Sequence, residues 1–297
     1  MSMNIIKELF YKIRNVRGRM QKKGRLQKYF AAKRIPWSEG YEDYKWDKIA
    51  EVINDASFLV KFMERKQLPA HYGTGLDERI VEYPYVFSNL SESSLRILDA
   101  GSTFNFAPVI SHPVFSKKEL TIFTAYPEKQ NFIHKKISYV YGDLRVLPFR
   151  DEWFDEVVCM STLEHIGMDN AIYGYGEETI KKADAGENTE YLKAVSELVR
   201  VLKRKGKLYI TVPFGQKINY GYFQQFDSLM VTSLNHMLES EGQSELTFFR
   251  YHSGGWHFSR MEECNDAEAF NPHTGQGKGI DGAAHSRSIC GIQFTKK

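Results

Sequence analysis

The chain has 297 residues, of which 42% are hydrophobic and 26% are charged, the composition of an ordinary globular protein. No stretch approaches the ~20 uncharged apolar residues of a membrane span, and charges interrupt the apolar N-terminal residues, unlike the core of a secretory signal. The three cysteines are far apart and form no CxxC pair, which predicts a reducing, cytoplasmic environment, no disulfide framework and no structural metal site.

The formal net charge of +3 is unevenly distributed along the chain. Residues 1–34 contain eleven Lys or Arg and one acid, Glu8, so this segment carries +10 and the remainder carries −7. A basic segment on a mildly acidic body is typical of proteins that dock on an anionic surface. We expect no nucleic-acid partner, because the cations are not interleaved with aromatic residues in a stacking pattern.

Residues 1–34 are expected to form a basic amphipathic helix. The apolar residues recur at helical spacing, with Lys and Arg on the other faces: Ile5, Ile6, Leu9, Phe10, Ile13, Val16 and Met20. This apolar stripe has two interpretations. The simpler is that it packs on the protein's own body or on a second copy. The other is that it lies on anionic lipid, which would make the protein membrane-peripheral.

Residues 35–92 are expected to form a mostly helical lead-in, best supported at residues 46–66. Pro84 and the serine-rich residues 88–94 predict a turn before the first strand. Residues 93–297 are expected to form the main domain.

From residue 95 onward, short apolar runs alternate with amphipathic segments. A helix is expected at residues 191–206, where basic residues and Gly206 would end it. Five parallel strands are expected at 95–100, 120–126, 137–143, within 154–166 and at 207–215, and two late strands at 244–252 and 287–295. This order predicts an α/β fold: a Rossmann-like, doubly wound, seven-stranded and mostly parallel sheet with helices on both faces.

In such a sheet, the ligand lies beyond the carboxyl ends of the strands. The residues that follow the first strand are Asp99, Gly101, Ser102 and Asn105. Gly101 lets the backbone approach a ligand without a Cβ in the way. Pro108 predicts the first turn of a helix, whose free N–H groups suit an anionic group.

The residues after the third and fourth strands also carry suitable chemistry. Gly142, Asp143 and Leu144 follow the third strand, where the carboxylate would accept a hydrogen bond from an amino group and the leucine would cover a flat ring. Ser161, Glu164 and His165 follow the fourth strand.

Three sequence blocks in this order resemble the class I S-adenosylmethionine-dependent methyltransferases of the type 11 group. They are ILDAGS at 97–102, the aspartate, Leu-Pro-Phe and Glu-His block at 142–166, and residues 197–215; the resemblance covers about residues 80–215. It implies that S-adenosylmethionine is the cofactor, with Asp99 and Gly101 facing its methionine portion. It also implies that Asp143 and Leu144 hold adenine, and that Ser161 approaches the amino-acid end.

Two features depart from the family's pattern, the glycine turn and the end of the second strand. The Gly-x-Gly-x-Gly turn reads Gly101-Ser102-Thr103-Phe104-Asn105, in which Asn105 tolerates positive φ and the β-branched Thr103 does not. The acid that grips the ribose at the end of the second strand is replaced by Thr124, and Glu128 is the candidate to compensate. We expect a modified site that still binds the cofactor.

Methyl transfer from a sulfonium is an in-line displacement, so the protein mainly orients the two partners and excludes water. An oxygen or nitrogen acceptor also needs a base to take its proton, and His165 is the first candidate because imidazole titrates near pH ~6.5. Glu164 would orient this histidine or the acceptor. The alternative is that His165 only packs the helix that follows.

A second cluster contains His252, Trp256 and His257 among glycines, and predicts a loop over the acceptor in which the tryptophan stacks on a ring. Ordinary packing is the alternative. Tyr220, Tyr222 and Phe223 are expected to line the same pocket. Glu262, Glu263 and Cys264 match no standard ligand spacing, so no metal is assigned. Residues 169–191 are expected to form a lid or an interaction surface.

These patterns predict a methyltransferase that acts on a small-molecule or glycan-linked acceptor by O- or N-methyl transfer. The resemblance also implies a role in surface polysaccharide synthesis. The rival hypothesis is a non-catalytic, methyltransferase-like binding or scaffold protein with an eroded cofactor site. The sequence identifies neither the acceptor nor the oligomeric state.

Overall fold

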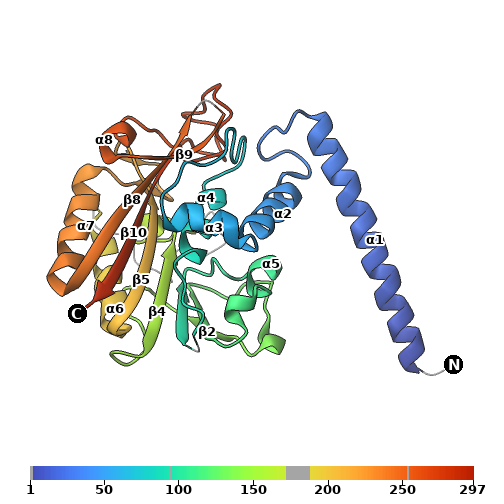
Figure 1. Cartoon of the computed structure of the whole chain (residues 1–297), viewed down its shortest axis with the longest axis horizontal. Helices are drawn as coiled ribbons and strands as arrows, with labels where there is room; N and C mark the ends of the chain where they lie inside the picture. The colour runs from blue at the N-terminus through green and yellow to red at the C-terminus, as the bar shows by residue number, and fades with distance from the viewer. Residues whose placement is uncertain (1–2, 94, 172–187, 253) are drawn as a thin grey trace.

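The computed structural model describes residues 3–93, 95–171, 188–252 and 254–297, and for residues 3–15 it describes the backbone alone. In the described chain, an eight-stranded sheet has the order β3–β2–β1–β4–β5–β10–β8–β9 (Figure 1). Strands β1 to β5 pair in parallel, whereas β10, β8 and β9 join the β5 side of the sheet through antiparallel pairs. The strands are β1 (Arg96–Ala100), β2 (Glu119–Thr124), β3 (Ser138–Tyr141), β4 (Phe154–Met160), β5 (Leu202–Pro213), β8 (Gly242–His252), β9 (Gly255–Ser259) and β10 (Ser288–Lys296).

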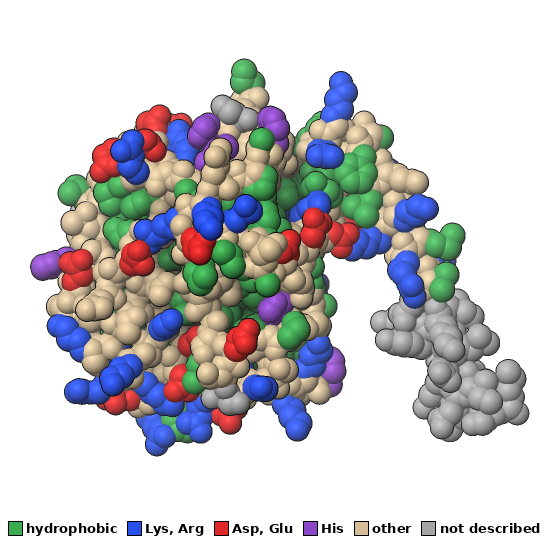
Figure 2. All heavy atoms as spheres, viewed as in Figure 1, with side chains coloured by type: hydrophobic (Ala, Val, Ile, Leu, Met, Phe, Trp, Pro, Cys, Tyr) green, Lys and Arg blue, Asp and Glu red, His purple; other side chains and the backbone are tan. Residues whose placement is uncertain are grey.

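The described helices are α1 (Met3–Ala31), α2 (Tyr41–Ile53), α3 (Ala56–Met63), α4 (Arg79–Phe87), α5 (Ala107–Ile110), α6 (Glu190–Val201), α7 (Ser228–Glu241) and α8 (Met261–Cys264). A separate two-stranded ribbon joins β6 (Ile218–Asn219) to β7 (Gln224–Gln225). Helix α1 extends away from the body toward the N-terminus (Figure 1). Figure 2 shows basic and hydrophobic side chains along its described stretch. Among the described residues, no helix combines the length and apolar character needed to cross a bilayer.

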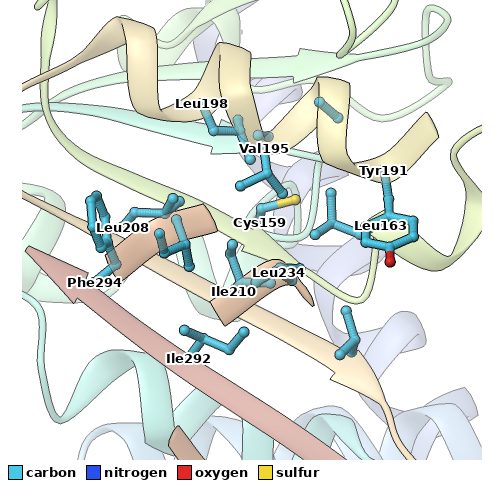
Figure 3. Close-up of a cluster of buried hydrophobic side chains, with 14 of the residues drawn as sticks. Cys159, Leu163, Tyr191, Val195, Leu198, Leu208, Ile210, Leu234, Ile292 and Phe294 are labelled. Atoms are coloured by element: carbon cyan, nitrogen blue, oxygen red, sulfur yellow. The ribbon is translucent and has the colours of Figure 1, made fainter. Parts of the chain in front are cut away.

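The α/β fold with helices on both faces of the sheet is confirmed. Helices α6 and α7 pack one face, where Cys159, Val195, Ile210 and Leu234 meet in a buried cluster (Figure 3). The other face is covered by the N-terminal helices, whose Ile49, Phe62 and Ile80 share a cluster with residues such as Ile97, Ile122, Tyr209 and Ile289 of the sheet. The helical lead-in and the sheet therefore share one hydrophobic core, while the proposed divisions at residues 34 and 92 stay predictions.

The predicted count of seven strands is wrong, because β9 adds an eighth. Strand β9 pairs antiparallel with β8, and Trp256 lies opposite Tyr251. Gly254 has φ of +81°, which suits the tight connection between the two strands. A Cβ on Gly255 would lie 3.1 Å from the backbone of His71, so the hairpin packs closely on the loop before α4.

The predicted helix at 191–206 ends early. It ends at Val201, and the next residue, Leu202, has extended backbone angles, is fully buried and pairs with Phe154 of β4. The basic residues that looked like a helix end belong instead to β5, where the register with β4 shifts and Lys205 has φ of +61°. Burial of Leu202 in the sheet thus outweighs the helical pattern that precedes it.

Pro84 was expected to mark a turn, but it lies inside α4. Proline has no N–H to donate to the carbonyl four residues earlier, which here belongs to Ile80. The Tyr72 hydroxyl donates a hydrogen bond to that carbonyl at 2.6 Å instead. A side chain from the preceding loop therefore replaces the missing helical hydrogen bond.

The structure also contradicts the expected loop of Trp256 over an acceptor. Trp256 is fully buried and its indole N–H donates to the carbonyl of Leu76 at 3.1 Å, which ties β9 to the segment before α4. His252 and His257 stack on each other with ring centroids 4.6 Å apart. Trp256 is therefore part of the packing between the sheet and the segment before α4, while His252 is exposed and His257 is half-buried.

We expect Trp256→Phe to lower the free energy of unfolding by roughly 2–4 kcal/mol, measured by urea denaturation. The substitution removes the hydrogen bond to Leu76 and leaves a cavity. Trp37 is a matched control, because its indole donates a similar bond to the carbonyl of Ala284 but its side chain is 45% exposed. A loss for Trp256→Phe no larger than that for Trp37→Phe would contradict the structural role.

Candidate functional site

A hollow of about 270 Å³ lies at the carboxyl ends of β1, β2, β3 and β4. Seven of the residues predicted from the sequence line it: Gly101, Thr124, Gly142, Asp143, Leu144, Ser161 and His165. Residues far apart in the chain therefore converge on one site, as the parallel sheet requires. The remaining lining residues are Arg79, Phe123, Ala125, Glu128, Thr162, Ile166, Gly167 and Asn170.

Asp99 lies under the loop after β1 rather than in the lining of the hollow. It is fully buried, and its Oδ1 accepts hydrogen bonds from the N–H (3.1 Å) and hydroxyl (3.0 Å) of Thr103. Its Oδ2 accepts from the N–H of Phe104 at 2.7 Å. Burial raises the pKa of Asp99 to about 7, against the opposing effect of these three hydrogen bonds. The carboxylate thus holds the loop in shape from below.

In the loop after β1, Gly101 (φ of +135°) and Ser102 (φ of +63°) have positive φ. Thr103 and Asn105 do not. The expectation that Asn105 replaces a glycine through its backbone tolerance is therefore wrong. A Cβ on Gly101 would lie 2.0 Å from the hydroxyl of Thr162, so this glycine is required by close packing against the residues after β4. Ser102 is buried and does not line the hollow.

The side chain of Asn105 acts on the β2 side of the hollow. Its amide donates to the Glu128 carboxylate at 2.7 Å and to the Gln130 carbonyl at 2.9 Å, and its Oδ1 accepts from the Tyr139 hydroxyl at 2.8 Å. Glu128 itself lines the hollow beside Thr124. A carboxylate is thus present near the end of β2, four residues beyond the position where the family's pattern places it.

The Asp143 carboxylate lines the hollow at the end of β3 and pairs with the guanidinium of Arg145 at 2.6–3.0 Å. Burial opposes its ionisation, but the hydrogen bonds from Arg145 lower the pKa of Asp143, so it is a hydrogen-bond acceptor at neutral pH. Arg145 is itself held by Glu190 of α6 at 2.6 Å. Leu144 is buried beside this carboxylate and gives the lining an apolar side chain.

A buried network connects α4 to the ends of β4 and β5. The Glu82 carboxylate is fully buried and accepts from the hydroxyls of Ser161 and Thr211, both at 2.5 Å, and from Arg79 at 3.0 Å. Burial of Arg79 opposes the charge of its guanidinium. The neighbouring Glu82 carboxylate outweighs this effect, so the pKa of Arg79 is raised. Arg79 lines the hollow with a side chain that is 25% exposed, so it presents a permanent positive charge there.

His165 lines the hollow on the side of the loop after β4. Its Nδ1 lies 2.8 Å from the carbonyl of Tyr222, so Nδ1 carries the proton and Nε2 is the basic ring nitrogen. Burial lowers the pKa of His165 to about 4. The expectation of an ordinary imidazole pKa near 6.5 is therefore wrong, and His165 is a neutral hydrogen-bonding group rather than a strong base at neutral pH.

Glu164 is buried and does not line the hollow. Burial raises the pKa of Glu164 to about 8, and the nearby Glu82 and Glu78 carboxylates add to this effect. Its Oε2 is a buried oxygen without a hydrogen-bond partner in the described chain. Glu164 is therefore mostly uncharged at neutral pH and lies behind the lining. This position does not support the expectation that Glu164 orients the acceptor directly.

Other predicted residues lie outside the hollow or outside the described chain. Tyr222 and Phe223 pack behind His165, with ring centroids 6.3 Å and 6.4 Å from the imidazole, and form a small cluster with Tyr220. Most of the predicted lid at 169–191 falls on residues 172–187, outside the described residues. Within the described ranges, no three His, Cys, Asp or Glu side chains come together as metal ligands.

Residues 115–210 match a family model described as "Methyltransferase domain", which confirms the resemblance to class I methyltransferases of the type 11 group. The match spans β2 to most of β5 and includes Thr124, Glu128, Asp143, Ser161 and His165. It begins after the loop that follows β1 and therefore excludes Gly101 and Arg79.

The chain is also similar to several individual proteins. Over 66 residues it is 36% identical to an uncharacterized protein of Methanocaldococcus jannaschii, an alignment that covers 22% of this chain and 19% of that protein. The chain thus spans about a fifth of that relative's length.

Two solved structures are similar at low sequence identity. A SAM-dependent methyltransferase of Thermotoga maritima, described as a possible histamine N-methyltransferase, is 14% identical, covers 85% of this chain and 100% of its own, and has a TM-score of 0.43. The N-methyltransferase NodS of Bradyrhizobium japonicum, in complex with S-adenosyl-L-homocysteine, is 11% identical, covers 85% and 98%, and has a TM-score of 0.39.

We expect Glu164→Gln to change how stability depends on pH. Because the pKa of Glu164 is raised from 4.5 to about 8 on folding, the folded chain keeps a proton that the unfolded chain releases in this window. Its contribution to stability is complete below the window and is lost at ~1.4 kcal/mol per pH unit through it. The unfolding free energy of the Gln variant, relative to wild type, should rise from pH 5 to pH 8 and then level off. A difference that stays constant with pH would contradict the raised pKa.

We expect the His165 ring to stay neutral across the physiological range, because its pKa is lowered to about 4. In ¹H–¹³C NMR spectra, the Cε1–H signal of His165, assigned by its loss in His165→Gln, should not shift between pH 5.5 and pH 8. A titration midpoint near the ordinary imidazole value of ~6.5 would show that the ring is more solvated than the structure indicates.

Proposed function

We propose, from the membership of this chain in the class I, type 11-like S-adenosylmethionine-dependent methyltransferases, that it transfers a methyl group to a small-molecule or glycan-linked acceptor. The observation that carries the proposal is the convergence of seven predicted residues on one hollow at the carboxyl ends of the parallel strands. Arg79 and Glu128 add a guanidinium and a carboxylate to the same lining. The site is thus altered in sequence without being closed by a side chain.

The lining residues fit the chemical groups of the cofactor. Asp143 is ionised and accepts hydrogen bonds, as the amino group of adenine requires, and Leu144 and Phe123 provide apolar surface for the ring. Glu128 provides the carboxylate that ribose hydroxyls require, held in place by Asn105. Such a charged hydrogen bond contributes ~1.5–3 kcal/mol, or roughly tenfold to hundredfold in affinity.

Arg79 is a cation of the lining, and Glu82 connects it to Ser161 at the end of β4. Its guanidinium suits a carboxylate, and the amino-acid end of the cofactor carries one. Because Glu82 holds Arg79 and also the hydroxyl of Ser161, these groups are positioned together before any ligand arrives. Positioning of this kind lowers the entropy that must be lost on binding.

The cofactor supplies an electrophilic methyl group on a sulfonium, and the chain's residues orient the acceptor and exclude water. His165, whose Nδ1–H donates to the Tyr222 carbonyl, lines the hollow with a neutral imidazole. It orients an O–H or N–H group of the acceptor, and its low pKa makes it a weak base. This role favours acceptors whose proton leaves during or after methyl transfer rather than before it.

We place the reaction in the cytoplasm, in surface polysaccharide synthesis. Two observations support this placement. Cys159, Cys264 and Cys290 are all free and buried thiols, as is common in a reducing compartment. The basic N-terminal segment suits a location near membranes, where glycan intermediates on lipid carriers are assembled.

Calorimetric titration of the full chain with S-adenosylhomocysteine tests the proposed site. We expect wild type to bind, Asp143→Ala to bind at least tenfold more weakly, and Glu128→Gln to lose roughly tenfold to hundredfold. The loss for Glu128→Gln should disappear when the ligand lacks both ribose hydroxyls, because the carboxylate then has no partner to lose. Thermal unfolding of each variant checks that the fold is intact.

Glu119→Gln is the matched control, because Glu119 begins β2 at the end of the strand opposite the hollow and pairs with Arg96. Its affinity should equal that of wild type. Absence of heat at millimolar S-adenosylhomocysteine with wild type would overturn the enzymatic proposal and favour a scaffold protein. Equal losses for both ligands in Glu128→Gln would overturn the ribose assignment alone.

A further inference from the structure

Helix α1 contacts the body through one face near its C-terminal end. Arg25 pairs with Asp43 of α2 at 2.6 and 2.9 Å, Lys28 pairs with Glu39 at 2.9 Å, and Lys22 pairs with Asp47. Tyr29 is fully buried against Tyr41 and Tyr44. These contacts determine which side of α1 faces the body.

The apolar stripe lies on the other side of α1. At about 100° per residue, Met20 lies about 180° from Tyr29 around the helix axis, and Val16 lies about 140° from it. Met20 is 70% exposed and Val16 is 53% exposed, and residues 16–21 are all exposed. The interpretation that the stripe packs on the protein's own body is therefore wrong for its described part. The other apolar residues of the stripe follow the same helical spacing toward the N-terminus.

We propose that the outward stripe of α1 is a docking surface for an anionic lipid membrane. The charges beside the stripe carry this choice of partner. Around the axis, Arg17 lies about 60° from Met20 on one side, and Lys23 and Arg19 lie about 60° and 100° from it on the other. All three cations are exposed, so the described apolar residues of the stripe, Val16 and Met20, have positive charge on both sides. Figure 2 shows this mixture of hydrophobic and basic side chains on the described part of the helix.

Other partners fit this surface less well. A second copy of α1 packed on this stripe would bring the exposed cations Arg17, Arg19 and Lys23 of one helix close to those of the other. RNA would neutralise the cations but leave the apolar strip in water. An anionic bilayer surface satisfies both at once, because the stripe enters the acyl boundary while cations meet the headgroups.

The geometry of the helix matches an orientation in the plane of the membrane. The stretch before Lys22 is about 28 Å long at ~1.5 Å per residue. Its two described apolar residues, Val16 and Met20, lie within about 40° of each other around the helix axis. The ion pairs of Lys22, Arg25 and Lys28 attach this helix to the body of the protein. The inference does not rest on the proposed function.

Co-sedimentation of the full chain with vesicles tests the proposal. The vesicles contain phosphatidylcholine alone, or phosphatidylcholine and phosphatidylglycerol at 7:3. We expect at least tenfold tighter binding to the anionic vesicles, because each neutralised cation adds about fivefold, and weaker binding at high salt. The double substitution Val16→Glu/Met20→Glu should reduce binding at least tenfold, and Arg17→Gln/Arg19→Gln/Lys23→Gln about hundredfold.

Met63→Glu is the matched control, because Met63 is an apolar residue of α3 that is 56% exposed. This variant should bind as wild type does. Equal binding of wild type to neutral and anionic vesicles would overturn the proposal. A second outcome would also overturn it: sedimentation velocity shows a dimer of wild type, and Val16→Glu/Met20→Glu abolishes this dimer but leaves vesicle binding unchanged. Binding to single-stranded RNA in place of vesicles would overturn it as well.

Discussion

The Glu82 carboxylate joins the N-terminal helices to the parallel sheet, and the arrangement of the hollow depends on it. This group is fully buried, and it accepts hydrogen bonds from residues at the ends of β4 and β5 and from Arg79 in its own helix. A buried carboxylate with one partner removed would carry an uncompensated charge, so the three contacts support one another. They hold the guanidinium of Arg79 at the edge of the hollow and the Ser161 hydroxyl beneath it.

The loop after β1 shows how a site can lose a familiar glycine pattern and keep its shape. Asp99 holds the loop from below through three hydrogen bonds, while Gly101 is required by its contact with Thr162. Ser102 adopts the left-handed backbone conformation. Positions 103 and 105 do not need positive φ, so they can hold residues other than glycine. Asn105 then uses its side chain to hold Glu128 at the hollow. The changes at 105 and at the end of β2 are thus physically linked.

The two titratable residues after β4 are shifted in opposite directions by the same cause. Burial lowers the pKa of His165 to about 4 and raises that of Glu164 to about 8, so both are mostly neutral near pH 7. His165 therefore brings little charge to the hollow, where Arg79 provides the positive charge. An uncharged imidazole adds no second positive charge near the guanidinium of Arg79.

Local patterns in the chain were enough to place the five parallel strands and the residues that follow them. Apolar runs and their spacing depend on neighbours in sequence, and the carboxyl ends of parallel strands share one edge, so Asp143, Ser161 and His165 could be assigned to one site. Long-range packing set the features that those patterns missed. Arg79 reaches the hollow from a helix of the lead-in, β9 exists because Trp256 is buried against the segment before α4, and the stripe of α1 faces outward because Tyr29 packs on α2. The pKa of His165 also belongs to this second group, since burial is created only when distant segments meet.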